Sequence, residues 1–342
     1  MKAVVFYRPG DIRFEEVDTP TPGPGEVLVR IGSALTCGTD LKTYRRGHPV
    51  MIKKTPALFG HEWAGTVEGV GEGVRHIRVE DRVVAANSAP CHRCFPCQIG
   101  RVNLCEDLEL LNGAYAEYIR VPARIVEQNL LTIPDHLTFA QAALVEPLAC
   151  ALYGIERSGV QLGQTLCIFG AGPMGLLLTQ LAKGQGGRVL VVGKGEFRLR
   201  KAAEAGADEI LDAARTENVV AEVRRLSPEG RGADVTIEAT GRPEVWEQAV
   251  EVTRKAGTVV LFGGCEPGTT FQVDTRRMHY EELTLVGVFH HTPRHIREAL
   301  ALLAQGVVDT NLFLTHRMAL GALPEAFDLL ARGEAIKVVL KP

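Results

Sequence analysis

Residues 166–175 read LCIFGAGPMG, a short apolar run followed at once by a glycine-rich hexapeptide. The apolar run has the length and composition of a buried β-strand, and the residues after it have the apolar spacing of a helix. A strand, a glycine turn and a helix in this order are the context in which a G-x-G-x-x-G motif binds a dinucleotide. The first glycine makes the tight turn, the second admits the pyrophosphate, and the third lets helix and strand pack closely. The candidate cofactor-binding residues of this loop are Gly170, Gly172, Pro173, Met174 and Gly175.

The alternation of apolar runs and helical stretches continues after this motif. Apolar runs lie at 189–192, 235–239, 258–264 and 283–289, and stretches with helical spacing lie at 174–184, 197–206 and 245–257. Strand, helix and strand at this rhythm build right-handed parallel βαβ units. We therefore predict an α/β fold with a doubly wound parallel sheet in this half of the chain.

The first 135 residues have a different pattern. They are rich in glycine and proline and contain short β-branched runs at 27–31, 64–70 and 82–86. This pattern is typical of a compact β-barrel-like domain with long loops. From Thr138, a plausible helix cap, the apolar spacing becomes helical, and we expect one helix there that joins the two domains.

Four cysteines form a compact run, CHRCFPCQIGRVNLC, with the spacing C-x2-C-x2-C-x7-C. Thiolates at this spacing converge only if the chain curls around a centre, and the pattern is typical of a structural Zn²⁺ site. A disulfide cluster or ordinary small core residues are the alternatives. The opening residues MKAVVFYRPG do not have the pattern of a secretory signal, so we expect a reducing compartment; the neighbouring residues are also polar, and we favour zinc. The predicted ligands are Cys91, Cys94, Cys97 and Cys105.

The overall composition excludes several classes of function. The chain has 342 residues, enough for two domains, and a formal net charge of −3, which gives no electrostatic case for nucleic acid or an anionic membrane surface. No apolar run approaches the ~20 residues that a membrane span needs. We therefore expect a cytoplasmic protein with neither a nucleic-acid nor a membrane partner, and with a small molecule as its substrate.

The acidic residue that usually holds both ribose hydroxyls about 20 positions after the glycine loop is missing. The second strand ends instead in Val-Gly-Lys-Gly, with Gly193 and Lys194 at the expected place. Without the carboxylate, a 2′-phosphate meets no repulsion, and Lys194, Arg198 and Arg200 could supply positive charge. We slightly favour NADP over NAD. The alternative is that these cations only face solvent and that the site takes NAD without the usual carboxylate.

A second group of zinc-competent side chains lies upstream. Cys37 in Cys-Gly-Thr-Asp, and His61 and Glu62 in Gly-His-Glu, supply a thiolate, an imidazole and a carboxylate on glycine-flanked loops. Singly, each would more often be a core residue. Together with Glu146 in the joining helix they form a mixed ligand set, which is typical of a catalytic zinc with an exchangeable position.

These motifs together resemble the zinc-dependent medium-chain dehydrogenase/reductase (alcohol dehydrogenase) superfamily over essentially the whole chain. The resemblance is carried by CGTD at 37–40, GHEWAGTVEGVG at 60–71, the four-cysteine run, EPL at 146–148 and GAGPMG. The EPL element is most similar to the polyol (sorbitol) and threonine dehydrogenase branch. The resemblance implies a GroES-like β-barrel catalytic domain at 1–145, a Rossmann domain at 146–289, and a return of the chain to the catalytic domain at 290–342.

The resemblance also implies roles for individual residues. Cys37, His61 and Glu62 would be zinc ligands, Glu146 would hold or exchange into the fourth position, and each subunit would carry two zinc ions. Asp40 would accept the ring N–H of His61 and fix its tautomer. A substrate hydroxyl would be stabilised as its alkoxide by the metal while hydride passes to nicotinamide. Thr39 would pass the alcohol proton outward, although a hydroxyl bonded to local backbone is the alternative.

Lys42 departs from the pattern of the related dehydrogenases. A His commonly stands three residues after the Thr to complete the proton path, and this chain has Lys42 there. A lysine relays protons only if burial or neighbouring positive charge lowers its pKa well below ~10. Lys42 could instead bind an anionic part of the substrate or cofactor, or face solvent.

The function expected from the sequence is hydride transfer between a secondary alcohol or polyol and NAD(P). A threonine or amino-alcohol dehydrogenase is the alternative with the same core, and a cofactor-binding relative without turnover is the alternative outside the enzymes. The intact set of zinc ligands argues against a cofactor-binding relative without turnover. The run 283–289 could extend a sheet across a two-fold axis, so we expect a homodimer or homotetramer. We interpret the pair His290 and His291 as a loop or a subunit contact.

Overall fold

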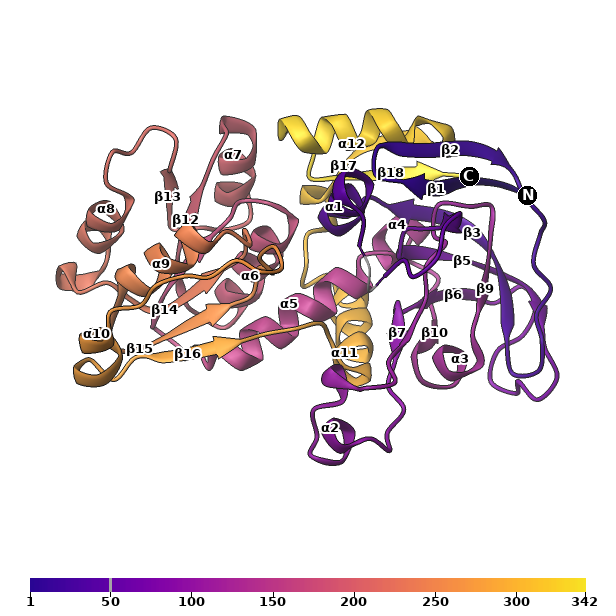
Figure 1. Ribbon diagram of the computed structural model, residues 1–342, viewed down its shortest axis with the longest axis horizontal. Coiled ribbons are helices and arrows are strands. Elements are labelled where there is room, and N and C mark those ends of the chain that lie inside the picture. Colours follow the sequence, from indigo (N-terminus) through magenta and orange to yellow (C-terminus); the bar gives the residue numbers. More distant parts are fainter. Residues whose placement is uncertain (49–50) are drawn as a thin grey trace. The chain divides into compact units, whose positions relative to one another are not determined.

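The computed structural model describes residues 1–48 and 51–342. Its contacts divide the chain into two units, which we call the split unit (Met1–Ala149 with His291–Pro342) and the central unit (Cys150–His290). The boundary falls inside helix α5 (Val145–Ser158). Figure 1 shows strands gathered into a separate core in each unit.

The core of the central unit is a six-stranded sheet in which every neighbouring pair of strands is parallel. Its order is β13 (Glu209–Asp212), β12 (Arg188–Gly193), β11 (Thr165–Phe169), β14 (Ala233–Glu238), β15 (Thr253–Leu261), β16 (Thr284–Gly287). The strand order reverses between β11 and β14, which makes the carboxyl ends of these two strands the switch point where such sheets bind ligands. The predicted doubly wound parallel sheet is confirmed.

Helices connect the strands of this sheet. They are α6 (Pro173–Gly184), α7 (Glu196–Glu204), α8 (Val219–Leu226), α9 (Pro243–Val252) and α10 (Thr275–Tyr280), with a 3₁₀ turn at Pro228–Gly230. All five residues of β11 are buried, as expected for a central strand covered on both faces. The strand side chains form one apolar core with residues of α8 and α9.

The helical stretch expected at 245–257 is shorter in the structure. Helix α9 ends at Val252, and Thr253 already begins strand β15. The Thr253 hydroxyl donates to the Ala249 carbonyl, and the sheet register shifts between Ala233 and Val235 on the neighbouring strand. β-Branched residues at Val250, Val252 and Thr253 favour this early change to extended backbone. The helical prediction for residues 253–257 is wrong.

The split unit is built on a seven-stranded sheet and two smaller ones. The large sheet has the order β10 (Leu130–Thr132), β6 (Arg82–Ala85), β5 (Glu62–Val70), β3 (Val27–Leu35), β18 (Lys337–Lys341), β17 (Leu314–Ala319), and β9 (Tyr118–Val121) also pairs with β3. The small sheets join β2 (Asp11–Glu16), β1 (Lys2–Arg8) and β4 (Ala57–Leu58), and β7 (Ser88–Ala89) with β8 (Glu109–Leu110). The expected β-rich domain is confirmed.

Short helices and turns complete this unit. They are α1 (Gly38–Arg46), α2 (Phe95–Gln98), α3 (Ala123–Asn129), α4 (Phe139–Ala142), α11 (Pro293–Ala304) and α12 (Leu323–Arg332), with 3₁₀ turns at Val102–Leu104, Thr310–Leu312 and Leu320–Ala322. The single helix expected from Thr138 is two helices, α4 and α5. Thr138 caps α4 in a capping box with Gln141, and the Leu144 N–H then bonds to the Gln141 carbonyl, a tighter turn that ends the first helix.

The C-terminal strand brings the two ends of the sequence together. Strand β18 pairs antiparallel with β3, with Val339 opposite Leu35 and Leu340 opposite Ala34. This register places Lys337 beside the end of β3, where the loop to α1 begins. Side chains of α12 also join the apolar core beneath β3 and β5.

Of the helices in the described residues, none combines the length and the apolar character that a bilayer crossing requires.

Candidate functional site

Cys37 stands at the junction between strand β3 and helix α1. It is the N-cap residue of α1, and its Sγ accepts a hydrogen bond from the Thr39 N–H at 3.4 Å. The sulfur therefore lies at the N-terminus of the helix, held there by the backbone of its first turn. The chain therefore presents a sulfur ligand at a fixed place.

Glu62 begins strand β5, which lies directly beside β3, and His61 is the residue just before the strand. Both are buried, with 3% and 1% of their surface exposed. The ligand atoms of Cys37, His61 and Glu62 all lie within 4.8 Å of one another. A soft thiolate, an imidazole and a carboxylate at this separation fit one zinc ion, and the three protein donors leave an open position.

Asp40 fixes the orientation of the His61 ring. Its Oδ1 lies 3.0 Å from His61 Nδ1, and its Oδ2 accepts a hydrogen bond of 2.6 Å from the hydroxyl of the fully buried Tyr115. Because Nδ1 then carries the proton, Nε2 keeps its lone pair for a metal. Burial opposes protonation of His61, but the charges of Asp40 and Cys37 outweigh it and raise its pKa well above the usual range in the metal-free protein.

Lys337 is the charged partner of Glu62. Its side chain is buried, and its Nζ donates to both Glu62 oxygens, with 2.7 Å to Oε1, and to the Thr36 carbonyl at 3.2 Å. Burial raises the pKa of Glu62 to about 7, although the charge of Lys337 acts in the opposite direction. The C-terminal strand thus supplies a cation to a site otherwise rich in anions.

Glu146 lies in the first turn of α5 and is also buried. Its carboxylate is outside the group formed by Cys37, His61 and Glu62. Instead its Oε1 lies 3.9 Å from Nε2 of His291, which is 2.9 Å from Oδ1 of Asn87. His291 lies in the loop before α11, as expected, but it is only 3% exposed and is therefore part of the interior near Glu146.

The two other candidates on α1 differ in exposure. Thr39 is half-buried in the first turn, next to Cys37, and its carbonyl accepts a hydrogen bond of 2.8 Å from the Thr43 hydroxyl. Lys42 is exposed one turn later. The Lys42 ammonium therefore stays in water in this structure.

The four-cysteine lobe consists of α2, a 3₁₀ turn and the loops around them. The sulfur atoms of Cys91, Cys94, Cys97 and Cys105 lie within 4.8 Å of one another, and all four cysteines are free. Four sulfurs at about 2.3 Å from a tetrahedral zinc lie about 3.8 Å apart, which is the distance between the sulfurs of Cys94 and Cys105, 3.8 Å. The backbone N–H of Arg93 lowers the pKa of Cys91 to about 6, which favours a thiolate ligand.

The glycine loop lies between β11 and α6, as the sequence predicts. Gly172 is the N-cap of α6, and Pro173 and Met174 open the helix. A Cβ on Gly175 would lie 1.7 Å from the Gly170 carbonyl oxygen, so only glycine permits this close packing of helix and loop. The loop stands at the switch point of the sheet with its helix N-terminus free for phosphate.

The second strand ends beside this loop. Gly193 is the last residue of β12, and a Cβ there would lie 2.6 Å from the Ala171 Cβ. Lys194 is exposed, whereas Arg198 in α7 is half-buried, and burial lowers its pKa. Arg200 packs over the Phe197 ring. Lys194 directly follows Gly193 in the sequence, and its side chain faces solvent.

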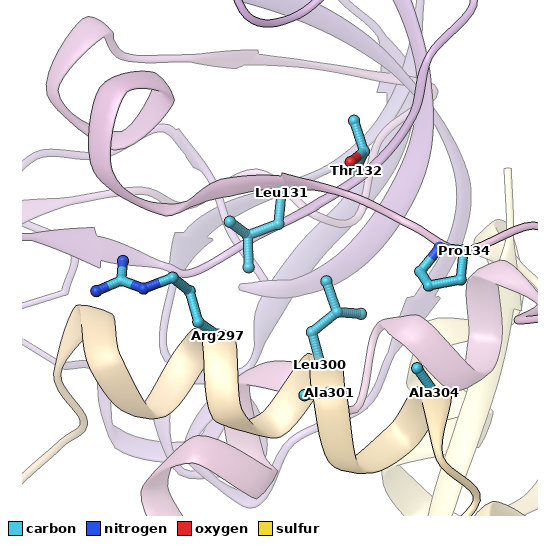
Figure 2. Close-up of a pocket in the computed structure, with 7 residues that line it drawn as sticks. All are labelled: Leu131, Thr132, Pro134, Arg297, Leu300, Ala301 and Ala304. Carbon is cyan, nitrogen blue, oxygen red and sulfur yellow. The ribbon is translucent and has the colours of Figure 1, made fainter.

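A separate open groove lies between α11 and the strand β10 (Figure 2). It is lined mainly by apolar groups of Leu131, Thr132, Pro134, Arg297, Leu300, Ala301 and Ala304. The groove contains none of the candidate catalytic or metal-binding residues.

Comparison with known proteins places this geometry in a family. The model of the zinc-binding dehydrogenases matches residues 173–305, and that of the alcohol dehydrogenase GroES-like domain matches residues 23–135. The sorbitol dehydrogenase of Halalkalibacterium halodurans is 32% identical over 352 aligned positions, which cover 100% of this chain and 99% of the relative. The chain belongs to the zinc-dependent medium-chain dehydrogenase family.

Further relatives agree with this assignment. The L-threonine 3-dehydrogenase of Pyrococcus horikoshii is 34% identical to this dehydrogenase and covers 99% of it, with 98% of the relative aligned. The crystal structure of a zinc-binding dehydrogenase from Sinorhizobium meliloti 1021, bound to NADP, has a TM-score of 0.91 and 32% identity, and covers 100% of this chain and 99% of that one. The resemblance to the polyol branch, the GroES-like and Rossmann fold, and an NAD(P)-dependent oxidoreductase activity are confirmed.

Sequence reasoning missed two residues of this dehydrogenase that contact the candidate ligands. Lys337 stands between the apolar residues Ile336 and Val338 in AIKVVLKP at 335–342, and a lysine inside an apolar run was the available signal. Tyr115 left no such signal, since a buried tyrosine is common in cores. Both become visible only when the fold brings them to Glu62 and Asp40.

Proposed function

We propose that this dehydrogenase oxidises a secondary hydroxyl of a small polyol and reduces the corresponding ketone in the reverse direction. The observation that carries the proposal is the buried group of Cys37, His61 and Glu62, whose ligand atoms lie within 4.8 Å of one another beside an oriented His61 ring. The sorbitol dehydrogenase relative supports a polyol as substrate.

The residues of the split unit have distinct roles in this reaction. Cys37, His61 and Glu62 would hold zinc. Glu146 would either exchange into the open coordination position or stay just outside the ligands. When bound, zinc supplies a Lewis acid that lowers the pKa of a substrate hydroxyl, and nicotinamide supplies the hydride acceptor. Thr39 Oγ1 accepts the hydroxyl proton and passes it toward solvent. Asp40 keeps the proton on His61 Nδ1 throughout.

Lys42 and the domain limits complete the assignment. Its exposure supports a role for Lys42 as a proton exit to solvent or a contact to an anionic substrate group rather than as a buried relay.

We assign residues 1–145 and 290–342 to the catalytic domain and 146–289 to the dinucleotide domain. The split unit holds Cys37, His61 and Glu62 and the central unit holds the glycine loop, which supports two domains of this kind. The units of the structure change at Ala149/Cys150 and His290/His291, so Glu146 itself lies in the split unit.

A substrate screen tests the proposed function. Sorbitol, related polyols and simple secondary alcohols are offered with NAD⁺ or NADP⁺, and the reduced nicotinamide is followed by its absorbance. We expect turnover with at least one polyol that exceeds turnover with the matching simple alcohol. No turnover of any alcohol by zinc-loaded protein would contradict the proposal and favour a cofactor-binding relative without turnover.

The 34% identical threonine dehydrogenase favours a second candidate, oxidation of an amino alcohol. Threonine and sorbitol share a secondary hydroxyl next to a carbon that carries another polar group. The same metal site therefore serves both, and only the pocket discriminates. Including L-threonine in the screen decides between the two candidates by their kcat/KM values.

We infer two zinc ions per subunit, one at Cys37, His61 and Glu62 and one in the four-cysteine lobe. The replacement Cys94→Ser should remove only the second. We expect zinc content to fall by about one ion per subunit and the midpoint of thermal unfolding to fall, because metal binding holds the lobe folded. The remaining folded protein should keep its kcat. Metal analysis and calorimetry check this; an unchanged zinc content would contradict the assignment.

We infer that the cofactor is NADP in preference to NAD. The absence of a carboxylate at Gly193 and the exposed Lys194 support this, and so does the NADP-bound structure at 32% identity. NAD remains the alternative cofactor.

A restored carboxylate at Gly193 tests the cofactor preference. Because a Cβ there would lie 2.6 Å from the Ala171 Cβ, Gly193→Asp is made together with Ala171→Gly, and Ala171→Gly alone is the control. We expect the ratio of kcat/KM for NADP⁺ to that for NAD⁺ to fall about tenfold or more, since the new charge repels a 2′-phosphate. A ratio equal to that of the control would count against the NADP assignment.

We also propose a homodimer or homotetramer in the cytoplasm. Strand β16 stands at the edge of the central sheet, and Phe289 just after it is 56% exposed, so a second copy can extend the sheet across a two-fold axis. The cluster of free thiols supports a reducing compartment.

A further inference from the structure

Glu238 is a carboxylate with no exposed surface at the carboxyl end of strand β14. It stands at the switch point of the central sheet, next to β11 and its glycine loop. Burying a carboxylate is costly unless hydrogen bonds compensate the loss of water. The Glu238 carboxylate therefore needs hydrogen-bond donors that compensate for its burial at this edge of the sheet.

The hydrogen-bond partners of the Glu238 carboxylate are two residues of the turn that follows the strand, Thr240 and Gly241. Its Oε1 accepts from the Thr240 N–H at 2.6 Å, from the Thr240 hydroxyl and from the Gly241 N–H at 3.1 Å. Its Oε2 accepts from the same Gly241 N–H at 3.2 Å. The side chain thus bends over its own C-terminal turn, residues 239–241, and holds the turn in one conformation.

This turn lies directly against the dinucleotide loop. A Cβ on Gly170 would lie 3.3 Å from Thr240 Cγ2 and 3.4 Å from the Ala239 carbonyl carbon. The Ala239 N–H donates to the Phe169 carbonyl at 2.9 Å, so the turn continues the sheet pairing up to the first glycine. The position of the turn therefore determines how much space lies beside Gly170.

The end of strand β15 supports the turn from the other side. A Cβ on Gly263 would lie 2.4 Å from the Gly241 nitrogen and 2.9 Å from Glu238 Oε2. The Gly263 carbonyl accepts the indole N–H of Trp246 at 3.2 Å. Trp246 is thus a fluorescent group one hydrogen bond away from this arrangement, whereas the second tryptophan, Trp63, lies in the core of the split unit.

We propose that Glu238 is a positioning residue of the dinucleotide site, which fixes the turn 239–241 as a wall against Gly170. The inference rests on the dinucleotide site of the proposed function. If the carboxylate is removed, two N–H groups and a hydroxyl lose their buried acceptor and the turn must rearrange to regain one. Because the cofactor binds where this turn and the glycine loop meet, the change acts on cofactor affinity rather than on the metal site.

The test compares Glu238→Ala and Glu238→Gln with the unmodified protein. Dissociation constants of NADPH and NADH are measured by nicotinamide fluorescence, and Trp246 emission is recorded in the same titration. We expect Glu238→Ala to raise both constants about tenfold or more, and Glu238→Gln to raise them less because its amide oxygen still accepts from Thr240. At saturating cofactor, kcat should stay within about threefold, so that the loss appears in KM.

Asp234→Asn is the matched control, because Asp234 is a carboxylate at the opposite end of the same strand. Its Oδ2 accepts from the Thr165 N–H and its Oδ1 pairs with Arg254 Nε, both at 2.7 Å. This change should lower the unfolding temperature while leaving both dissociation constants unchanged. It thereby separates general loosening of the sheet from an effect at the cofactor edge.

Several outcomes overturn the proposal. Wild-type affinity in folded Glu238→Ala would do so, as would an equal loss of affinity in Asp234→Asn. If Glu238→Ala does not fold, an unchanged dissociation constant in Glu238→Gln together with unchanged Trp246 emission would also overturn it. Failure of the unmodified protein to bind either dinucleotide would contradict the proposed function instead, so the two failures are distinguishable.

Discussion

Replacement of Cys37 by serine is expected to abolish turnover while the fold is retained. A serine hydroxyl is a far poorer zinc ligand than a thiolate, so the catalytic zinc should be lost and kcat/KM should fall by about 10³-fold or more, given that a Lewis-acid metal contributes several kcal/mol to the barrier. Metal analysis should show a loss of about one zinc ion per subunit, and steady-state kinetics should show the loss of activity.

The fold survives this replacement because Cys37 also has a local role that serine can take over. Its Sγ caps helix α1 through the Thr39 N–H, and serine is among the preferred N-cap residues. The circular dichroism spectrum and unfolding temperature should therefore change little, in contrast to Cys94→Ser. Full activity in folded Cys37→Ser protein that lacks the zinc would refute the assignment of this metal site.

The sequence predicts most of the fold because both units follow strong local patterns. The run at 166–169 is the interior of β11, and GAGPMG is the loop to α6, because parallel strands and glycine turns have distinctive compositions. Errors occur at boundaries: helix α9 ends at Val252, and the helix expected from Thr138 is divided. At both places a local turn or strand pairing outweighs a continuing helical pattern.

The candidate metal site is predicted from sequence only as far as its ligands are chemically distinctive. Cys37, His61 and Glu62 stand out by residue type and by glycine neighbours. Lys337 is 275 positions from Glu62 in the sequence, and Tyr115 is 75 positions from Asp40. Contacts over such separations cannot be predicted from a local sequence pattern. Glu238 likewise looks like the end of an apolar strand until its turn is seen to fold back on it. Partners that only the tertiary fold brings together need the structure.

The buried pair of Lys337 and Glu62 leads to the second large prediction. In zinc-stripped protein, Lys337→Met should lower the free energy of unfolding by about 3–5 kcal/mol, because Glu62 must then either stay a buried carboxylate without this counter-charge or take up a proton. Methionine keeps much of the length and the apolar stem of lysine, so the loss of packing is small. Urea denaturation followed by circular dichroism measures the change.

A surface lysine provides the matched control. The Lys183 Nζ lies 2.9 Å from Asp208, but the side chains are 34% and 36% exposed. Lys183→Met should therefore cost only about 0–1 kcal/mol, since water and side-chain entropy offset an exposed ion pair. An equal effect of the two replacements would mean that burial of the Lys337 pair does not determine its energy.

The double replacement Lys337→Met with Glu62→Gln separates the charge from the packing. Removing both charges should restore most of the stability lost in Lys337→Met, because no unpaired charge remains in the interior. Zinc added to the single variant should also restore part of it, since a divalent cation bound at Cys37, His61 and Glu62 would supply positive charge next to the carboxylate. If neither change restores stability, the cost lies in packing around β18, and Lys337 is not the counter-charge of the metal site.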